Sequence, residues 1–273
     1  QGKPTAVKLP GSKQLKEFVK LLAKRAEAIR GGNVDPREDN MLTVVGDGRK
    51  AALDLRLAIP GMDDIALSKI NISAQNIAAI YHHTAERKSA QIVFCDLGTP
   101  KPERANYVKM KNHPDEPITC SDCGQSDEEM FVVPSRDVLC PACFERREQE
   151  EKQPVSTVFK NVYADLKAKL VSLGVHPSEI AFIHDAKGPA ERSQLFDAVR
   201  EGRIRVLIGS TEKMGTGMNV QTRALAMHHL DAPWRPADLE QREGRIIRQG
   251  NMYPEAFSFV YIVESSFDGY SWQ

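Results

Sequence analysis

The chain has 273 residues, of which 41% are hydrophobic, so it can bury at least one sizeable core and is not globally disordered. Lysine plus arginine equals aspartate plus glutamate at 37 each, so no overall charge attracts a polyanion, and nucleic-acid contact would need a local patch. No apolar run approaches the roughly 20 residues that cross a bilayer, and no secretory signal opens the chain. We therefore expect a cytoplasmic protein without membrane contact.

Residues 1–72 predict a helical lead-in. Apolar side chains repeat at helical spacing over 13–30. A short strand is then expected over 41–45, followed by a Gly-Asp-Gly turn at 46–48 and a second helix over 49–59. We expect this region to pack against the rest of the protein.

From residue 73 the pattern changes to alternating helices and strands, which is typical of a parallel sheet with helices on both faces. The strands are almost uniformly apolar, as in a sheet that is buried on both sides. The expected helices cover 73–88, 161–173, 190–201 and 236–248, and the expected strands cover 91–97, 180–185, 205–210, 224–231 and 257–265. The sequence thus predicts an α/β domain formed by 73–97 and 155–273.

An insertion interrupts this domain at 98–154. It is rich in Pro, Lys, Glu and Asp and shows neither helical nor strand periodicity. A loop of this length without structure of its own is uncommon inside a compact domain. A bound metal ion that cross-links the segment would give it a structure of its own.

Two CxxC pairs in the insertion provide a suitable ligand set. The pairs are Cys120 with Cys123 and Cys140 with Cys143, separated by 16 residues. Four thiolates on two tight turns complete a tetrahedral shell that selects zinc, which leaves no open position for catalysis. Free buried thiols and an iron–sulfur cluster are the alternatives. We predict a structural zinc that supplies folding energy to a segment with few large apolar residues.

Residues 205–221 place a Gly-rich loop directly after an apolar strand. Ser210 and Thr211 end the strand, and Gly215, Gly217 and Asn219 follow in the loop. Glycines at this position let the backbone approach a phosphate group. Alone, the loop is weak evidence, because such loops are common.

A second segment, 230–251, strengthens the argument. Gln241, Arg245 and Arg248 are spaced four and three apart, which predicts one face of a helix, with Arg242 pointing elsewhere. Planar guanidinium groups on one face suit the charge that develops on a transferring phosphoryl group. A solvated helix would instead interleave its arginines with Lys and Glu.

Taken in order, these segments resemble motifs V and VI of superfamily 2 helicases, and most of all those of the Swi/Snf-like branch. The resemblance is good over 155–263 and loose over 49–97. Arg235, Gln249 and Asn251 depart from the branch pattern without removing a charge from the arginine positions. The matching residues are Ser210, Thr211, Gly215, Gly217, Asn219, Asp231, Trp234, Pro236, Gln241, Arg245 and Arg248.

The resemblance implies a RecA-like lobe and specific roles for its residues. Arg245 and Arg248 would be arginine fingers that reach ATP, and Gln241 would help organise that interface. The loop that begins at Ser210 and Thr211 would couple the nucleotide state to the nucleic-acid backbone. The family also implies DNA, in duplex form, as the partner.

What the sequence lacks completes this interpretation. It contains neither a GxxxxGK[ST] phosphate loop nor a DExx box for magnesium. ATP and Mg²⁺ would therefore be held mainly by an N-terminal helicase lobe of the same polypeptide. Since the first residue is Gln1 rather than Met, we expect a piece of a longer protein. The insertion and lead-in resemble the helicase portions of very large phage and plasmid proteins that also carry adenine methylase regions, which implies a bacterial or phage source.

Two functions remain open at this point. The first is the C-terminal lobe of an ATP-driven motor on DNA, and unaltered arginines at 245 and 248 favour it. The second is a non-catalytic RecA-like module that presents its zinc ribbon to DNA or protein. A Rossmann-type methyltransferase or dehydrogenase has almost no support, because no GxGxxG follows the first strand.

Overall fold

The computed structural model describes residues 4–32, 34–100, 108–112, 117–133, 137–151, 159–215, 218–233 and 236–271. The chain forms two compact units. The main unit comprises Gln1–Pro100 and Phe159–Gln273, and the insertion unit comprises Lys101–Val158. The insertion had been predicted at 98–154. No helix in the described part of the chain is both long and apolar enough to cross a membrane.

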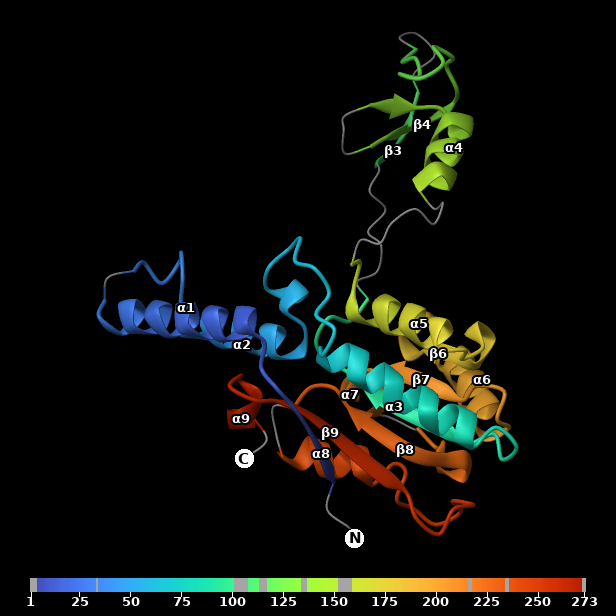
Figure 1. Cartoon of the computed structure of the whole chain (residues 1–273). Helices are drawn as coiled ribbons and strands as arrows, with labels where there is room; N and C mark the ends of the chain where they lie inside the picture. The colour runs from blue at the N-terminus through green and yellow to red at the C-terminus, as the bar shows by residue number, and fades with distance from the viewer. Residues whose placement is uncertain are drawn as a thin grey trace. The chain divides into compact units, whose positions relative to one another are not determined.

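A six-stranded sheet, parallel throughout, forms the centre of the main unit (Figure 1). Its strand order is β1-β9-β8-β2-β7-β6. Every residue of β2 and β7 is buried, which explains why their sequences are apolar without alternation. The strands are β1 (Thr5–Leu9), β2 (Ala90–Phe94), β6 (Ile180–Phe182), β7 (Val206–Gly209), β8 (Ala224–His229) and β9 (Phe257–Val263).

Helices cover both faces of this sheet, as predicted. On one face, α3 (Lys69–His83) and α5 (Val162–Ser172) pack Ile77 and Leu166 against Val93. On the other face, α6 (Pro189–Arg200) packs Phe196 against Ile92. The remaining helical segments are η1 (Leu55–Leu57), η2 (Pro177–Glu179), η3 (Ile183–Asp185), α7 (Thr211–Gly215), η4 (Gln221–Arg223), α8 (Pro236–Glu243) and α9 (Asp268–Ser271).

The lead-in is not entirely helical. Thr5–Leu9 form β1, which pairs in parallel with β9 and places Val7 opposite Tyr261. Partners more than 250 residues apart leave no local signal in the sequence, so this strand could not be recognised from periodicity. The first strand of the chain therefore completes the edge of the sheet beside the last one.

Two antiparallel helices, α1 (Lys13–Arg30) and α2 (Met41–Leu53), form a hairpin beside this edge (Figure 1). The predicted strand over 41–45 and turn at 46–48 are wrong, because α2 runs through both. A tertiary contact accounts for one of the two glycines, Gly48, in the middle of a helix. A Cβ on Gly48 would lie 2.2 Å from the ring of Phe267, so only glycine lets that ring pack against α2.

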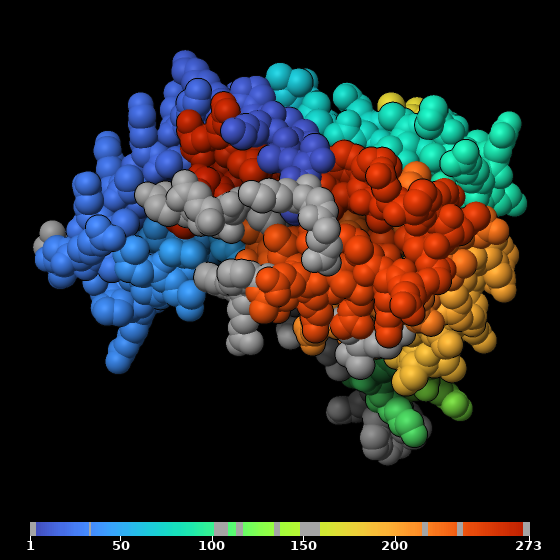
Figure 2. Space-filling model, turned by 90° about the horizontal axis from the view of Figure 1, so that it is seen from below, coloured from blue at the N-terminus to red at the C-terminus, as the bar shows by residue number. Residues whose placement is uncertain are grey.

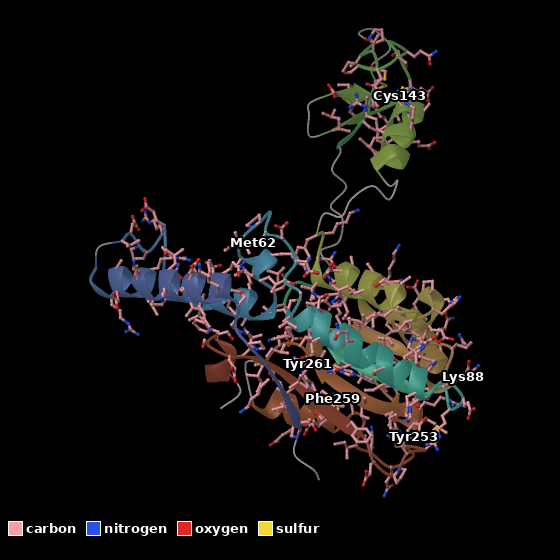
Figure 3. The ribbon with its side chains drawn as sticks, in the orientation of Figure 1. Met62, Lys88, Cys143, Tyr253, Phe259 and Tyr261 are labelled. Atoms are coloured by element: carbon pink, nitrogen blue, oxygen red, sulfur yellow. The ribbon has the colours of Figure 1, made fainter. Side chains whose placement is uncertain are left out.

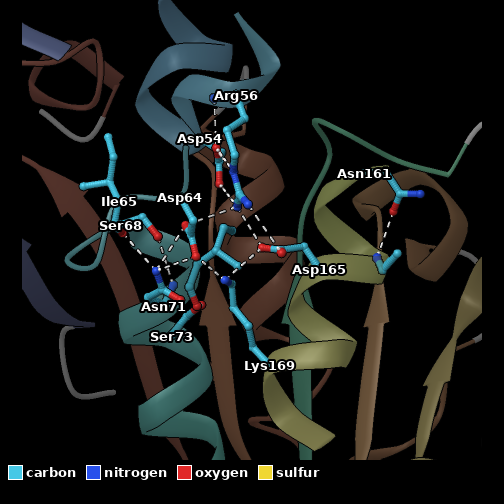
Figure 4. Close-up of polar contacts among 12 residues, drawn as sticks. Asp54, Arg56, Asp64, Ile65, Ser68, Asn71, Ser73, Asn161, Asp165 and Lys169 are labelled. Atoms are coloured by element: carbon cyan, nitrogen blue, oxygen red, sulfur yellow. Dashed lines mark hydrogen bonds and ion pairs between the residues drawn. The ribbon is translucent and has the colours of Figure 1, made fainter. Parts of the chain in front are cut away.

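A cluster of charged side chains joins η1 to α5 (Figure 4). The Arg56 guanidinium donates to Asp54 at 2.7 Å and to Asp165 at 2.8 Å. It also lies 4.1 Å from the centre of the Phe159 ring. Lys169 pairs with Asp64 in the same cluster. These contacts fix the start of α5, where the chain returns from the insertion unit.

A buried polar network crosses the sheet between β2, β8 and β9. Tyr261, which projects from β9 (Figure 3), bonds to His228 Nδ1 at 2.9 Å and accepts from Asn76 Nδ2 at 3.2 Å. His228 Nε2 bonds to Gln91 Oε1 at 3.0 Å. The polar atoms inside the sheet are therefore satisfied.

The insertion unit contains a small antiparallel sheet and one helix. The strand order is β3-β4-β5, formed by β3 (Val108–Lys111), β4 (Glu129–Val132) and β5 (Val138–Leu139), and α4 (Pro141–Glu151) follows. Its core consists of Met130 and Leu139 with the three cysteines Cys120, Cys140 and Cys143. So few apolar residues make a poor core, as the sequence indicated.

Candidate functional site

Three polar side chains follow neighbouring strands at the carboxyl edge of the main sheet. Asp96 lies two residues after β2, Thr211 two residues after β7, and Asp231 two residues after β8. Because β8, β2 and β7 are adjacent and parallel, their carboxyl ends meet. This edge of an open α/β sheet is where ligands usually bind.

Hydrogen bonds tie the three loops together. The Asp96 carboxylate accepts from the backbone N–H of Thr211 at 2.6 Å and from its hydroxyl at 2.8 Å. The Asp231 carboxylate accepts from the backbone N–H of Asp96 at 2.6 Å and of Leu97 at 2.7 Å. The loop after β2 is thus held on both sides.

The Arg242 side chain, from α8, lies at the centre of this arrangement and is fully buried. Its guanidinium donates to Asp96 Oδ2 at 2.7 Å and to Thr211 Oγ1 at 2.8 Å. It also donates to the Asp231 carbonyl at 3.1 Å and lies over the Phe94 ring. One arginine therefore connects the ends of three strands with the segment that follows α8.

His229 extends the network toward β9. Burial and the nearby Arg242 cation lower the pKa of His229 well below its ordinary value, so the ring is neutral. Nδ1 then accepts from Arg242, and Nε2–H donates to Ser258. Ser258 in turn donates to Glu243 at 3.1 Å. This tautomer satisfies every member of the chain.

The Asp231 carboxyl group is buried, and burial disfavours its ionised form. Burial and the neighbouring Asp96 carboxylate raise its pKa to about 6, although Arg242 and two backbone N–H groups act in the opposite direction. A buried carboxylate with a raised pKa depends on its cation. The charge of Arg242 is therefore needed for the folded loops.

The predicted coupling loop is partly defined. Ser210 is buried, and its hydroxyl accepts from the backbone N–H of Lys213. Gly215 ends α7, and Asn219 is exposed with its carbonyl accepting from Arg200 at 2.8 Å. Gly217, Trp234 and Arg235 lie outside the described residues. The glycine loop thus follows directly from the segment that Arg242 holds.

The motif VI segment differs from prediction in two ways. The helix expected over 236–248 ends at Glu243, so Arg245 and Arg248 lie in the turns that follow α8 and not on a helical face shared with Gln241. Arg242, which we expected to point away, is the buried residue. The buried side chain of Ile246 anchors the turns in the core.

Arg245 and Arg248 remain available for a ligand. Arg245 is half-buried, while Arg248 and Gln241 are exposed. Within the described residues, neither guanidinium has a hydrogen bond or an ion pair. Arg242 is therefore buried and hydrogen-bonded inside the protein, whereas Arg245 and Arg248 have no such contacts in the described part of the chain.

The four predicted metal ligands come together in the insertion unit. The Sγ atoms of Cys120, Cys123, Cys140 and Cys143 all lie within 4.8 Å of one another. Tetrahedral zinc with bonds of about 2.3 Å requires Sγ–Sγ distances of about 3.8 Å, so the cluster needs little adjustment. Gly124, with φ +73°, makes the tight turn after the first pair.

The protonation chemistry of the cluster fits a metal. Against the opposing effect of burial, backbone N–H groups lower the pKa of Cys120 to about 6. Burial and the three other cysteines raise the pKa of Cys143 to about 12. Four thiolates cannot coexist at this spacing without a cation. The donor set is soft and complete, and could bind zinc.

Sequence patterns did not predict Arg242 or Asp96 as site residues. A signal was present, because Asp96 and Asp231 directly follow apolar strands, where a buried carboxylate needs a cation. Helical spacing alone placed Arg245 and Arg248 on one helical face with Gln241, since it assumed a helix that continues past Glu243.

Comparison with known proteins bears on this geometry. Residues 136–250 match the family model of the helicase conserved C-terminal domain. This range holds Thr211, Asp231 and Arg242, together with Arg245 and Arg248. The match to this helicase family model therefore covers most of the candidate site, although Asp96 lies outside it.

Individual relatives cover different shares of the chain. Defense against restriction protein B of Escherichia phage P1 is 35% identical over 71 residues, which are 26% of this chain and only 3% of that protein. The C-terminal part of the Fun30 ATPase domain superposes with a TM-score of 0.56 at 11% identity, covering 99% of this chain and 88% of that one. The Pyrococcus furiosus Hef helicase domain gives a TM-score of 0.38 at 12% identity, over 94% of this chain and 38% of that one. The Fun30 superposition shows a RecA-like helicase C-terminal fold.

Proposed function

We propose that the chain is the C-terminal lobe of an ATP-dependent DNA helicase or translocase of superfamily 2, in its Swi/Snf-like branch. The main support for this proposal is the difference in environment among the three arginines of the motif VI segment. Arg242 is buried and fully engaged, whereas Arg245 and Arg248 follow it without a partner in the described chain. Two free guanidinium groups on an anchored segment suit an anionic ligand.

In this proposal Arg245 and Arg248 are arginine fingers. A guanidinium presents a rigid fork of N–H donors that spreads over the charge developing on the transferred phosphoryl group. Gln241, in the last turn of α8, would organise the same interface. Because Ile246 anchors the turns, both fingers start from a fixed backbone.

The network around Arg242 supplies a route for coupling. It joins the finger segment to Thr211, the first residue of α7, through a hydrogen bond of 2.8 Å. A displacement of the fingers when ATP binds would therefore reach the loop that holds Gly215, Gly217 and Asn219. That loop would contact the nucleic-acid backbone with its glycine N–H groups.

Other components of the motor would lie outside this sequence. The 273 residues contain no phosphate loop and no DExx box, so an N-terminal lobe of the same polypeptide would hold ATP and Mg²⁺. Zinc would serve structure alone, because four cysteines leave it no open position. The match to a phage P1 protein supports a phage or plasmid source in a bacterial cytoplasm.

Single-turnover ATP hydrolysis in the polypeptide that contains both lobes tests the finger assignment. Arg248→Ala and Arg245→Ala should each lower the rate by about 10³–10⁵, with little change in nucleotide affinity. Arg248→Lys should not restore the rate, because an ammonium group lacks the planar fork. Arg203→Ala is the matched control, since Arg203 is exposed and its guanidinium pairs with Glu201 at the surface.

DNA binding measured in parallel separates the alternatives. If Arg248→Ala leaves hydrolysis intact and abolishes DNA binding, the segment is a phosphate-backbone contact instead of a finger. If neither variant changes either property, the second function, a non-catalytic RecA-like module with a zinc ribbon, is the better description.

A further inference from the structure

Helix α1 carries a row of lysines along one side. Lys13–Arg30 contains six basic and two acidic residues, in a chain whose net charge is zero. Lys16, Lys20 and Lys24 follow at intervals of four and lie within about 60–80° of one another around the helix, together with Lys13. All four are exposed. We call Lys16, Lys20 and Lys24 the lysine face.

The structure of the hairpin does not depend on this face. Leu15 and Leu22, the buried residues of α1, lie on the opposite side of the helix. Arg25 joins α1 to α2 by donating to Asp39 at 2.8 Å and to Asp47 at 3.0 Å. The basic residue that holds the hairpin together is thus an arginine on the inner side. Figure 2 shows the hairpin at one end of the unit, with its blue side chains projecting outward.

The charges of the lysine face are not neutralised by the described chain. Lys13 has a weak exposed pair with Glu17 at 4.0 Å. In the regions that the structure describes, Lys16, Lys20 and Lys24 have no ion pair. An ordinary solvated helix would alternate lysine with glutamate at these spacings. Here Glu17 lies at one side of the face, about 20° from Lys24, and Glu27 follows on the same side of the helix one turn beyond Lys24, so that neither lies between the lysines.

We propose that the lysine face binds the phosphate backbone of duplex DNA. This proposal rests on the proposed function, which supplies DNA as the partner. Eight residues separate Lys16 from Lys24, a length of about 12 Å along the helix. The same length along a duplex spans about three to four phosphates of one strand. Because the chain as a whole is neutral, such a patch is what DNA attraction requires.

Salt dependence of binding to a random-sequence duplex tests the proposal directly. The variant Lys16→Gln/Lys20→Gln/Lys24→Gln keeps good helix formers and removes three charges. The slope of log K against log salt should become shallower by about 2 to 3, which is the loss of three phosphate contacts. The triple Lys→Arg variant should retain the full slope, because it retains the charges.

The control removes three lysines elsewhere in the main unit, Lys88, Lys160 and Lys167. Lys88 lies at the far end of α3 from the hairpin (Figure 3). This control should leave the slope unchanged. If the unaltered chain binds DNA with a salt dependence that the lysine-face variant keeps, or if the control loses as much, the lysine-face proposal is wrong and the helicase proposal stands. If the unaltered chain does not bind DNA even at low salt, the lysine-face proposal fails, whereas the helicase proposal is decided by hydrolysis in the polypeptide that contains both lobes.

Discussion

Replacing Arg242 should destabilise the main unit severely, although its sequence position predicted an unimportant residue. Arg242→Met keeps much of the side-chain volume and removes the guanidinium. The change would leave the carboxylates of Asp96 and Asp231 without their cation. It would also remove the donors to Thr211 Oγ1 and His229 Nδ1.

The burial of the Arg242 side chain sets the expected size of this destabilisation. Removing one partner of a buried ion pair costs about 3–5 kcal/mol, because the other charge stays uncompensated. Asp96 is 29% exposed, so part of its charge is screened and the lower end, about 3 kcal/mol, applies. The loss in free energy of unfolding caused by Arg242→Met should become smaller as the pH falls from 8 to 5. Asp231 already has a raised pKa of about 6, and protonation removes the charge that lacks a partner.

Urea unfolding followed by tryptophan fluorescence measures this loss. Both tryptophans, Trp234 and Trp272, fall in the sequence of the main unit. Arg203→Met, at an exposed pair, should change the free energy of unfolding by less than about 0.5 kcal/mol. Adding Asp96→Asn to Arg242→Met should recover part of the loss, because one of the two carboxylates left without a cation is then replaced by a neutral amide. A loss below about 1 kcal/mol for Arg242→Met, or additive losses in the double variant, would refute the reasoning.

Further predictions concern the insertion unit, α2 and the buried histidines. The chain should bind one zinc ion by metal analysis, and Cys140→Ser with Cys143→Ser should abolish binding while Cys95→Ala leaves it intact; zinc retained by the double variant would contradict the site. Gly48→Ala should lower the free energy of unfolding by about 1–3 kcal/mol through the clash with Phe267. Gly46→Ala, with open space around its Cβ position, should instead raise it by up to about 1 kcal/mol, so equal effects would exclude the packing explanation. Burial lowers the pKa of His228 to about 3, and that of His229 also falls well below normal. Below pH ~6.5 the unfolded chain therefore binds protons at these histidines that the folded chain does not bind. The free energy of unfolding should fall by about 1.4 kcal/mol per pH unit for each histidine. Below about pH 6 the folded chain binds one proton at Asp231, which offsets the effect of one histidine. His228→Gln should remove one proton from that slope in unfolding measured between pH 6 and 4.5, and an unchanged slope would show that the histidine is not responsible.

Much of the fold could be predicted because the strands of a doubly covered sheet are apolar and regularly separated by helices. The cysteine cluster could also be predicted from the sequence, since the spacing within each CxxC pair lets both thiolates bind the same metal ion. Local patterns failed where distant contacts decide. The Gly-Asp-Gly sequence at 46–48 lies inside α2, because Phe267 packs on Gly48 and Asp47 binds Arg25. Arg242 was missed for the same reason, since its carboxylate partners lie on other strands.

The parallel pairing of β1 with β9 also constrains how the protein is made. During synthesis, Thr5–Leu9 leave the ribosome long before Phe257–Val263 exist, so β1 has no partner strand while the nearly 250 residues between them are made. Closing a loop of this length adds an entropic barrier, and contacts between distant segments form slowly. The other five strands can assemble first, which makes the docking of β1 a final step. The hairpin of α1 and α2, which follows β1 directly in the chain, would reach its final position only when that step is complete.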